Sequence, residues 1–134
     1  MSTVDFEQFA VPALHLPLGG RTYVVSPPSV EDAAKILALA VAAEVKLGIV
    51  TGEVPPEIQG ILDTIGQDEH PALREAYGQM RLHEVPAATI DRAAMFAVFF
   101  WAKGRAYAEA IATLLFTDTG SEESEEVAAT APKG

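Results

Sequence analysis

One stretch of this sequence restricts the possible fold more than any other. The segment Ala93–Ala102, AAMFAVFFWA, contains no polar side chain and holds three of the six Phe and the only Trp in the chain. The spacing of apolar residues predicts a helix from about Thr89 to Phe116, which is long for a small domain. Because exposed apolar surface is unfavourable in water, this helix must be covered by its own fold, by a second copy or by another protein.

Charge and composition exclude several classes of function. A membrane span needs about 20 consecutive apolar residues, and Lys103, Arg105 and Glu109 interrupt this helix too early. The net charge of −10 at pH 7 disfavours nucleic acids and anionic membranes as partners, since both attract basic surfaces. The chain has no Cys, which rules out disulfides and thiolate metal sites.

A β-hairpin is predicted over residues 14–26. The segment LHLPLGGRTYVV alternates apolar with other residues on both sides of Gly19-Gly20. Glycine accepts the positive φ angles of a tight hairpin turn, so the pair marks the reversal. Pro17 has no N–H to donate, so the first strand is expected at a sheet edge.

Three shorter helices are predicted between the hairpin and the long helix. Ser29 has the chemistry of an N-cap, and acids follow it where the helix dipole favours them. Gly48 and Gly66 suit helix ends. The predicted spans are 29–47, 56–65 and 71–83. The expected fold class is therefore mainly α: a small helical domain with an N-terminal β-hairpin and a long C-terminal helix.

The predicted domain occupies residues 13–116, between two segments of different character. Residues 1–12 form an N-terminal arm. This arm either docks on the domain through Phe6, Phe9 and Val11 or stays loose. Residues 117–134 carry five acidic residues and one base. The segment has too few apolar residues to offset the conformational entropy that the chain would lose on folding. An acidic, disordered tail is therefore expected there.

No pattern in the sequence indicates catalysis, a metal or a cofactor. Phosphate-binding loops, dinucleotide-binding turns and nucleophile elbows are absent from the sequence. His15, His70 and His83 are scattered, and none pairs with another His or an acid at the spacing of metal ligands on a helix. We expect solvated surface histidines and a protein that is not an enzyme, with a metal site assembled by folding as the less favoured alternative.

The aromatic residues of the last helix are the candidate site. Trp, Tyr and Phe are typical anchors of protein interfaces, and burial in the core is the alternative for each. Trp101 shares a helical stripe with Ile111 and Leu115, so it is expected to be the most deeply buried. The predicted partner-binding residues are Phe96, Phe99, Phe100, Trp101 and Tyr107.

Two segments carry a resemblance to a known group of proteins. They read LPLGGRTYVVSPPSVEDAAKI and HEVPAATIDRAAMFAVFFWAKGRAYAEAI, with a polar region between them. This order resembles the small tail assembly chaperones of long-tailed (siphovirus) phages that infect actinobacteria. The likeness covers residues 10–115 in outline and contains no catalytic signature.

The resemblance implies a role in phage tail assembly. Such chaperones bind the tape measure protein, a long and largely helical chain, and keep it soluble while tail tube subunits polymerise around it. They act in the host cytoplasm and are absent from the mature virion. An apolar aromatic surface and an acidic chain both suit this role.

The family also suggests a longer product. In many of these phages, a programmed ribosomal frameshift near the end of the gene adds a domain thought to recruit the tail tube protein. The final residues Ala131-Pro132-Lys133-Gly134 permit a slippery codon string. A solubilising terminus with no further role is the alternative for this tail.

Other functions remain open at the level of sequence. The main alternative is a structural head–tail connector or tail completion protein, which would stay in the particle. One further alternative is a small enzyme or metal-binding protein that uses His15, His70 or His83. Another is a bacterial antitoxin-like or regulatory protein that docks a partner with the same helix. A second copy of the chain is also a candidate partner.

Overall fold

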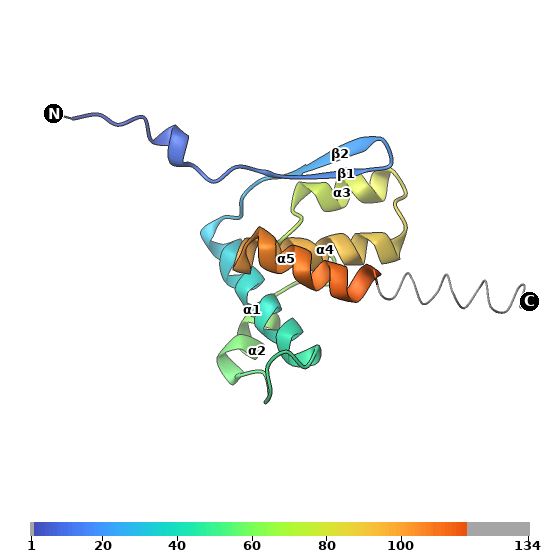
Figure 1. The fold of residues 1–134 in the computed structure, drawn as a ribbon. Helices are drawn as coiled ribbons and strands as arrows, with labels where there is room; N and C mark the ends of the chain where they lie inside the picture. Colours follow the sequence, from blue (N-terminus) through green and yellow to red (C-terminus); the bar gives the residue numbers. More distant parts are fainter. Residues whose placement is uncertain (1, 118–134) are drawn as a thin grey trace, which may run out of the picture.

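The structure, a computed structural model, describes residues 2–117. Within this range the chain forms a two-stranded sheet and five α-helices, which confirms the predicted fold class (Figure 1). The elements are η1 (Phe6–Phe9), β1 (Leu14–Leu18), β2 (Arg21–Val25), α1 (Val30–Lys46), α2 (Pro56–Leu62), α3 (Glu75–Leu82), α4 (Ala87–Lys103), α5 (Arg105–Ala112) and the π-helical turn η2 (Thr113–Thr117). The predicted tail from residue 118 onward lies outside the described residues.

The hairpin forms where the alternating pattern predicts it. Strands β1 and β2 pair antiparallel, with Leu14 opposite Val25. Gly19 and Gly20 have φ angles of 61° and 83°, the conformation that a two-residue primed turn requires. Leu14, Tyr23 and Val25 are buried, and β2 packs against α3. One face of the hairpin is therefore part of the core.

Helix α1 also follows its sequence signals. The Ser29 hydroxyl accepts a hydrogen bond from the amide of Asp32 at 3.2 Å, which satisfies one free donor at the helix start. At the other end Gly48 has a φ of 78°, as expected just beyond a helix C-terminus. The predicted start and end of this helix are confirmed.

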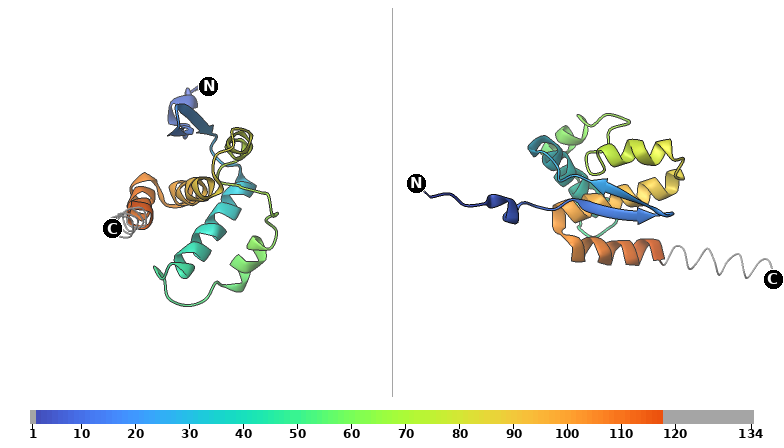
Figure 2. Two further views of the ribbon diagram at one scale, coloured as in Figure 1. Left: turned by 90° about the vertical axis from the view of Figure 1, so that its right-hand side faces the viewer. Right: turned by 90° about the horizontal axis from the view of Figure 1, so that it is seen from above.

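Helix α4 lies at the centre of the domain. In Figure 2 (left), α1 lies on one side of it, α3 and the hairpin on a second, and α5 on a third. Phe99, the largest fully buried side chain, projects from α4 into a single cluster of buried residues. The other members of this cluster are Leu14, Tyr23, Val25, Ile36, Ala40, Ala72, Leu73, Ala76, Met80, Ile90, Ala97, Val98 and Ala108.

The predicted helix from Thr89 to Phe116 is wrong as a single element, because it breaks at Gly104. This residue has φ 102° and ψ 167°, a region of backbone space that is essentially restricted to glycine. The chain reverses there, and α5 runs back alongside α4 (Figure 2). Ala97 and Ala108 are buried, and such small side chains allow two helices to pack closely. The long apolar segment thus covers part of itself.

Two shorter helices differ from their predicted spans. Helix α2 ends at Leu62 instead of continuing to Ile65. Helix α3 begins at Glu75 instead of Pro71, because residues 71–74 form turns in which the amides of Leu73 and Arg74 both bond to the carbonyl of His70. Arg74 itself has a φ of 53°, which an α-helix does not permit.

We expect Gly104→Ala to lower the free energy of unfolding by about 1–3 kcal/mol, the usual strain for a side chain held in this backbone region. An added Cβ at Gly104 meets no atom within 4 Å, so the loss comes from the backbone alone. Urea denaturation followed by Trp101 fluorescence measures it.

The matched control is Gly78→Ala, within α3. Gly78 has no positive φ, and a Cβ there also meets nothing within 4 Å. Alanine should raise stability at this position by up to ~1 kcal/mol through helix propensity. If Gly104→Ala behaves like Gly78→Ala, the reversal between α4 and α5 does not depend on glycine.

Candidate functional site

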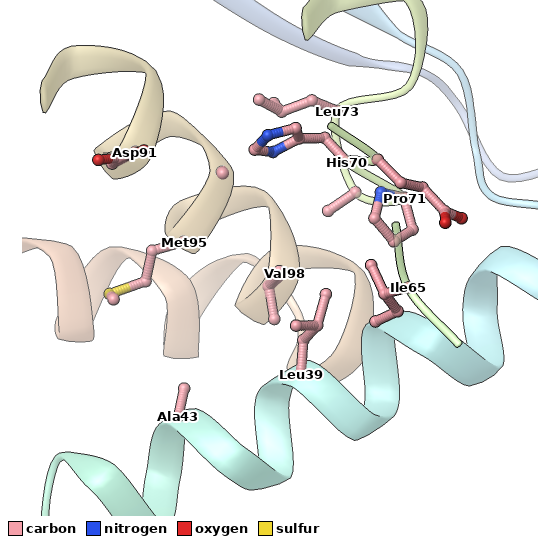
Figure 3. Close-up of a pocket in the computed structure, with 12 residues that line it drawn as sticks. Leu39, Ala43, Ile65, His70, Pro71, Leu73, Asp91, Met95 and Val98 are labelled. Carbon is pink, nitrogen blue, oxygen red and sulfur yellow. The ribbon is translucent and has the colours of Figure 1, made fainter. Parts of the chain in front are cut away.

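Helix α4 leaves two apolar depressions open on its surface. The first, named here the α1–α4 groove, has a volume of about 290 Å³. Figure 3 shows its side chains converging from α1, from α4 and from the connection between α2 and α3. Its lining residues are Leu39, Ala43, Ile65, Glu69, His70, Pro71, Ala72, Leu73, Asp91, Ala94, Met95 and Val98.

The shape of the α1–α4 groove follows from residue size at helical spacing. Leu39 and Ala43 are one turn apart on α1, as are Ala94 and Val98 on α4, so each pair lies on one helix face. The two alanines leave space that larger side chains would close. Met95 adds an unbranched, polarisable side chain that adapts to different contacts. The result is an open and mostly apolar surface between two helices.

Acidic side chains lie at the rim of this groove. The Lys35 ammonium contacts the Glu69 carboxylate at 2.6 Å, and the amide of Gly66 donates to the same carboxylate at 2.9 Å. The hydrogen bond from Lys35, followed by that from Gly66, holds the pKa of Glu69 below its ordinary value. Glu69 therefore stays ionised at neutral pH, and Asp91 lines the groove as a second acid.

His70 was predicted to be a solvated surface side chain, but the structure places it in contact with another ring. Its ring stacks on Tyr77 with 3.9 Å between ring centroids, and the side chain is partly buried. Burial lowers the pKa of His70, while the nearby charges of Asp91 and Asp68 oppose the shift. The neutral imidazole is therefore favoured in the folded state.

The other two histidines have separate surroundings. His83 forms a hydrogen bond through Nδ1 with the Tyr23 hydroxyl at 2.9 Å, whereas His15 is exposed on β1. Across residues 2–117, no three His, Asp or Glu side chains gather in a way that could hold a metal ion.

The second depression, named here the β1–α5 groove, lies between the hairpin and the chain after Gly104. It has a volume of about 300 Å³, and Arg92 is its only charged lining residue. The Arg92 guanidinium lies 5.2 Å from the centre of the Phe116 ring, a cation–π distance. The full lining is Leu16, Pro17, Leu18, Met80, Thr89, Arg92, Ala93, Phe96, Ala112 and Phe116.

Three of the five predicted partner-binding residues form one partly exposed aromatic face. Phe96 lines the β1–α5 groove, and its ring stacks on Phe100 at 6.2 Å. Phe100 in turn meets the edge of Trp101 at 4.9 Å, and Arg105 lies 5.4 Å above the Phe100 ring. These three aromatic side chains keep part of their surface in solvent.

Phe99 and Tyr107 do not belong to that face. Phe99 is 0% exposed, so a partner cannot contact it, and its prediction as a docking residue is wrong. The Tyr107 ring packs 5.5 Å from Phe99, and its hydroxyl donates to Glu44 on α1 at 2.6 Å. Lys103 lies 3.6 Å from the same carboxylate. Tyr107 thus joins α5 to α1 and stabilises the fold.

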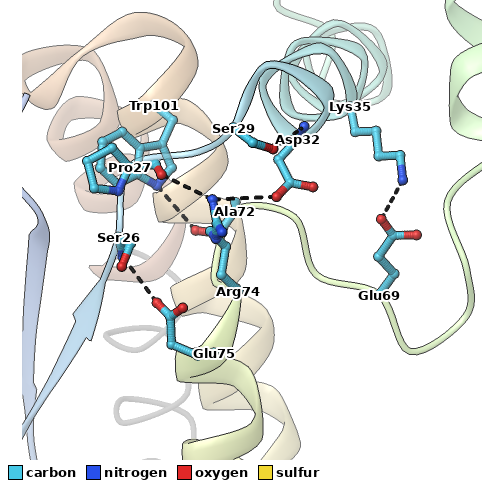
Figure 4. Close-up of polar contacts among 10 residues, drawn as sticks. All are labelled: Ser26, Pro27, Ser29, Asp32, Lys35, Glu69, Ala72, Arg74, Glu75 and Trp101. Atoms are coloured by element: carbon cyan, nitrogen blue, oxygen red, sulfur yellow. Dashed lines mark hydrogen bonds and ion pairs between the residues drawn. The ribbon is translucent and has the colours of Figure 1, made fainter.

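Trp101 is partly exposed, so the prediction that it is the most deeply buried aromatic residue is wrong. Its side chain is instead held in place by a hydrogen bond. Its indole N–H donates to the carbonyl of Ala72 at 3.2 Å (Figure 4). Arg74 reinforces this region by donating to the Pro27 carbonyl at 3.1 Å and by lying 3.6 Å from Asp32. The connection between β2 and α1 is therefore tied to the turn before α3.

Sequence reasoning missed the α1–α4 groove. Leu39, Ala43, Ala94 and Met95 are ordinary helix-forming residues, and nothing in the sequence indicates that their faces meet. The available signal was the fully apolar middle of each helix, which predicts contact on more than one side. It does not predict which side stays open.

The fold and the two grooves define a small helical protein with open apolar surfaces on both sides of its central helix. No helix within residues 2–117 has both the length and the hydropathy of a transmembrane span. Residues 4–134 match the family described as "Domain of unknown function (DUF7426)", and the chain belongs to this family. No curated protein and no solved structure matches the chain.

Tyr107→Phe should lower the free energy of unfolding by about 1.5–3 kcal/mol, because it removes a hydrogen bond to a charged group. The interaction raises the pKa of Tyr107 to about 12, since it favours the protonated phenol. Its contribution is therefore complete below about pH 10 and is lost as the pH rises toward 12. Chemical denaturation at pH 8 and pH 11 measures both effects.

Tyr77→Phe is the control for this substitution. Among residues 2–117 the Tyr77 hydroxyl forms no hydrogen bond, and Phe preserves the ring that stacks on His70. Equal stability of the two variants would contradict a stabilising role for the Tyr107–Glu44 bond.

His70→Phe should reduce the loss of stability on acidification. Burial lowers the folded-state pKa of His70, so the unfolded chain binds more protons once the pH falls below about 6.5. The wild-type protein therefore loses stability as the pH falls through this range, and the variant lacks that component. Denaturation midpoints at pH 7.5 and pH 5.5 test this, with His15→Phe as the control. A wild-type pH dependence in His70→Phe would contradict the assignment.

Proposed function

We propose that this protein is a tail assembly chaperone of a long-tailed actinobacterial phage and that its client is the tape measure protein. The sequence resemblance in the hairpin and in the last apolar segment supports the identity of the client. The observation that carries the proposal is the open α1–α4 groove. A soluble domain that leaves an apolar groove along its central helix is suited to binding another chain.

The dimensions of the α1–α4 groove favour a helical client. At about 290 Å³ it lies just below the range of pockets that enclose small molecules, which span ~300–1,000 Å³. An amphipathic helix can lie across such a groove and insert only the side chains of one face, at positions i, i+3 and i+4. Leu39, Met95 and Val98 would contact those inserted side chains.

The charges at the rim define the client further. Glu69 is already paired with Lys35, whereas Asp91 lines the α1–α4 groove and forms no ion pair within residues 2–117. An acid at an interface rim attracts basic residues and steers association. We therefore expect client helices with an apolar face flanked by Lys or Arg. The net charge of −10 would also keep chaperone–client complexes apart and in solution.

The remaining parts of the role follow from this assignment. A tail assembly chaperone acts in the host cytoplasm and leaves before the virion is complete. The aromatic face of Phe96, Phe100 and Trp101 stays a predicted partner surface, distinct from the client groove. Recruitment of the tail tube protein through a frameshifted longer product also stays a prediction, and the residues it concerns lie beyond residue 117.

Ala94→Glu should abolish capture of the tape measure protein without unfolding the domain. The longer charged side chain would occupy the groove, and its carboxylate would be desolvated by a bound apolar helix. We expect the affinity for the tape measure protein to fall at least tenfold, equivalent to ~1.4 kcal/mol of binding free energy, and the yield of soluble tape measure protein on co-expression to fall with it. Circular dichroism confirms that the variant is folded.

The matched control is Ala88→Glu, the same substitution on the same helix. Ala88 is exposed and does not line the α1–α4 groove, so this variant should capture the client normally. Equal capture by both variants would remove the groove from the proposal. A tape measure protein that stays insoluble with the wild-type chain, or the presence of this protein in purified virions, would contradict the chaperone function itself.

A further inference from the structure

The N-terminal arm exposes apolar side chains that its own domain does not cover. Val4, Phe6, Phe9 and Val11 are 66, 70, 61 and 64% exposed. Figure 1 shows the arm leading away from the body, on the side where β1 begins. Four large apolar side chains within eight residues are a costly surface to leave in water. Their exposure suggests that the arm is bound elsewhere.

The arm has a defined shape. In η1 the rings of Phe6 and Phe9 lie 5.5 Å apart, on the same side, because side chains three apart eclipse in a 3-10 helix. Asp5 caps the helix by accepting a hydrogen bond from the amide of Glu7 at 3.2 Å. Such an ordered aromatic pair loses less conformational entropy on docking than a flexible segment does.

The β1–α5 groove is complementary to this arm in chemistry. It is apolar except for Arg92, and within residues 2–117 no carboxylate lies within ion-pair distance of that guanidinium. The arm carries two acids, Asp5 and Glu7, on either side of Phe6. An arm seated in the groove would place aromatic rings on apolar surface and an acid near its unpaired base.

We propose that the arm of one copy docks in the β1–α5 groove of a second copy of this chain. The eight arm residues outside η1 span up to about 27 Å when extended and the four residues of η1 add about 8 Å, whereas a domain of this size has a radius of gyration of about 13 Å. The arm therefore reaches well beyond its own body. Reciprocal exchange of two arms gives a closed, symmetric dimer.

This interaction does not compete with the proposed client. Thr89, Arg92, Ala93 and Phe96 line the β1–α5 groove, whereas Asp91, Ala94, Met95 and Val98 line the α1–α4 groove. At 100° per residue these two sets lie on nearly opposite sides of α4. The proposal therefore stands whether or not the tape measure protein is the client.

Sedimentation velocity of the full chain over a range of concentrations tests the proposal. We expect a concentration-dependent dimer, and Phe6→Ser with Phe9→Ser should weaken it at least about 100-fold, because two aromatic anchors are lost. Both residues are exposed, so the domain stays folded. The control is Leu82→Ser, which removes a side chain 78% exposed on α3 and should leave the dimer intact.

A charge exchange tests the site. Arg92→Glu should weaken the dimer by about tenfold at low salt, and adding Glu7→Arg should restore it if the two charges meet. The natural chain has no Cys, so chains carrying Gln8→Cys and Thr89→Cys can be mixed, and an intermolecular disulfide should form between them.

Three results would overturn the proposal. One is a chain that stays monomeric at all concentrations, which would indicate an arm folded onto its own body or left free. Another is a dimer unaffected by the paired Phe substitutions. The third is a dimer lost on removal of residues 118–134 but kept without the two Phe, which would assign the groove to the acidic tail.

Discussion

The packing of α5 against α4 is the constraint on which the rest of the structure depends. An apolar helix at the centre of a small domain must be covered on several sides, and few elements are available to do so. The backbone conformation at Gly104 turns the chain back on itself, and the buried Ala97 and Ala108 let the two helices approach closely. Tyr107 then reaches Glu44 on α1, so the same reversal also fixes α5 to a third helix.

The two grooves are the parts of the α4 surface that the other elements of the fold leave uncovered. The hairpin and α3 cover one side of α4, α5 covers another, and α1 covers a third (Figure 2). The remaining gaps are lined by alanine and by the partly exposed Met95 and Phe96. Larger residues at the alanine positions would close the gaps and stabilise the monomer. Their absence is consistent with surfaces that bind other chains.

Local signals in the sequence predicted the local structure well. The glycine pair of the hairpin and the Ser29 cap of α1 have conformations that depend on a few neighbouring residues, and both predictions are confirmed. The break at Gly104 was not predicted, because glycine inside a helical pattern costs only about 1 kcal/mol and is often tolerated. Whether such a glycine stays helical also depends on contacts between α5 and α1, such as the bond from Tyr107 to Glu44, and those residues are distant in sequence.

The candidate site also depends on contacts between distant residues, so the sequence predicted only part of it. The sequence identified the aromatic cluster, but it could not assign each ring to the core or to the surface. Phe99 and Phe100 are adjacent and differ by 100° around α4, which is enough to bury Phe99 completely and leave Phe100 only partly buried. The α1–α4 groove was missed because it is made by faces of two helices that become neighbours only in the folded chain.

The opposite placement of the two grooves has a consequence for a protein that binds a long client. A single α1–α4 groove would hold one short face of the proposed client helix, and the affinity of one such contact is limited. Two copies joined through the β1–α5 grooves would present two client grooves at a fixed separation, so that the second contact forms at a high effective concentration. The same central helix would then serve assembly on one side and client binding on the other. Its excess of apolar surface, which is unfavourable in a lone subunit, would then be the source of both proposed interactions.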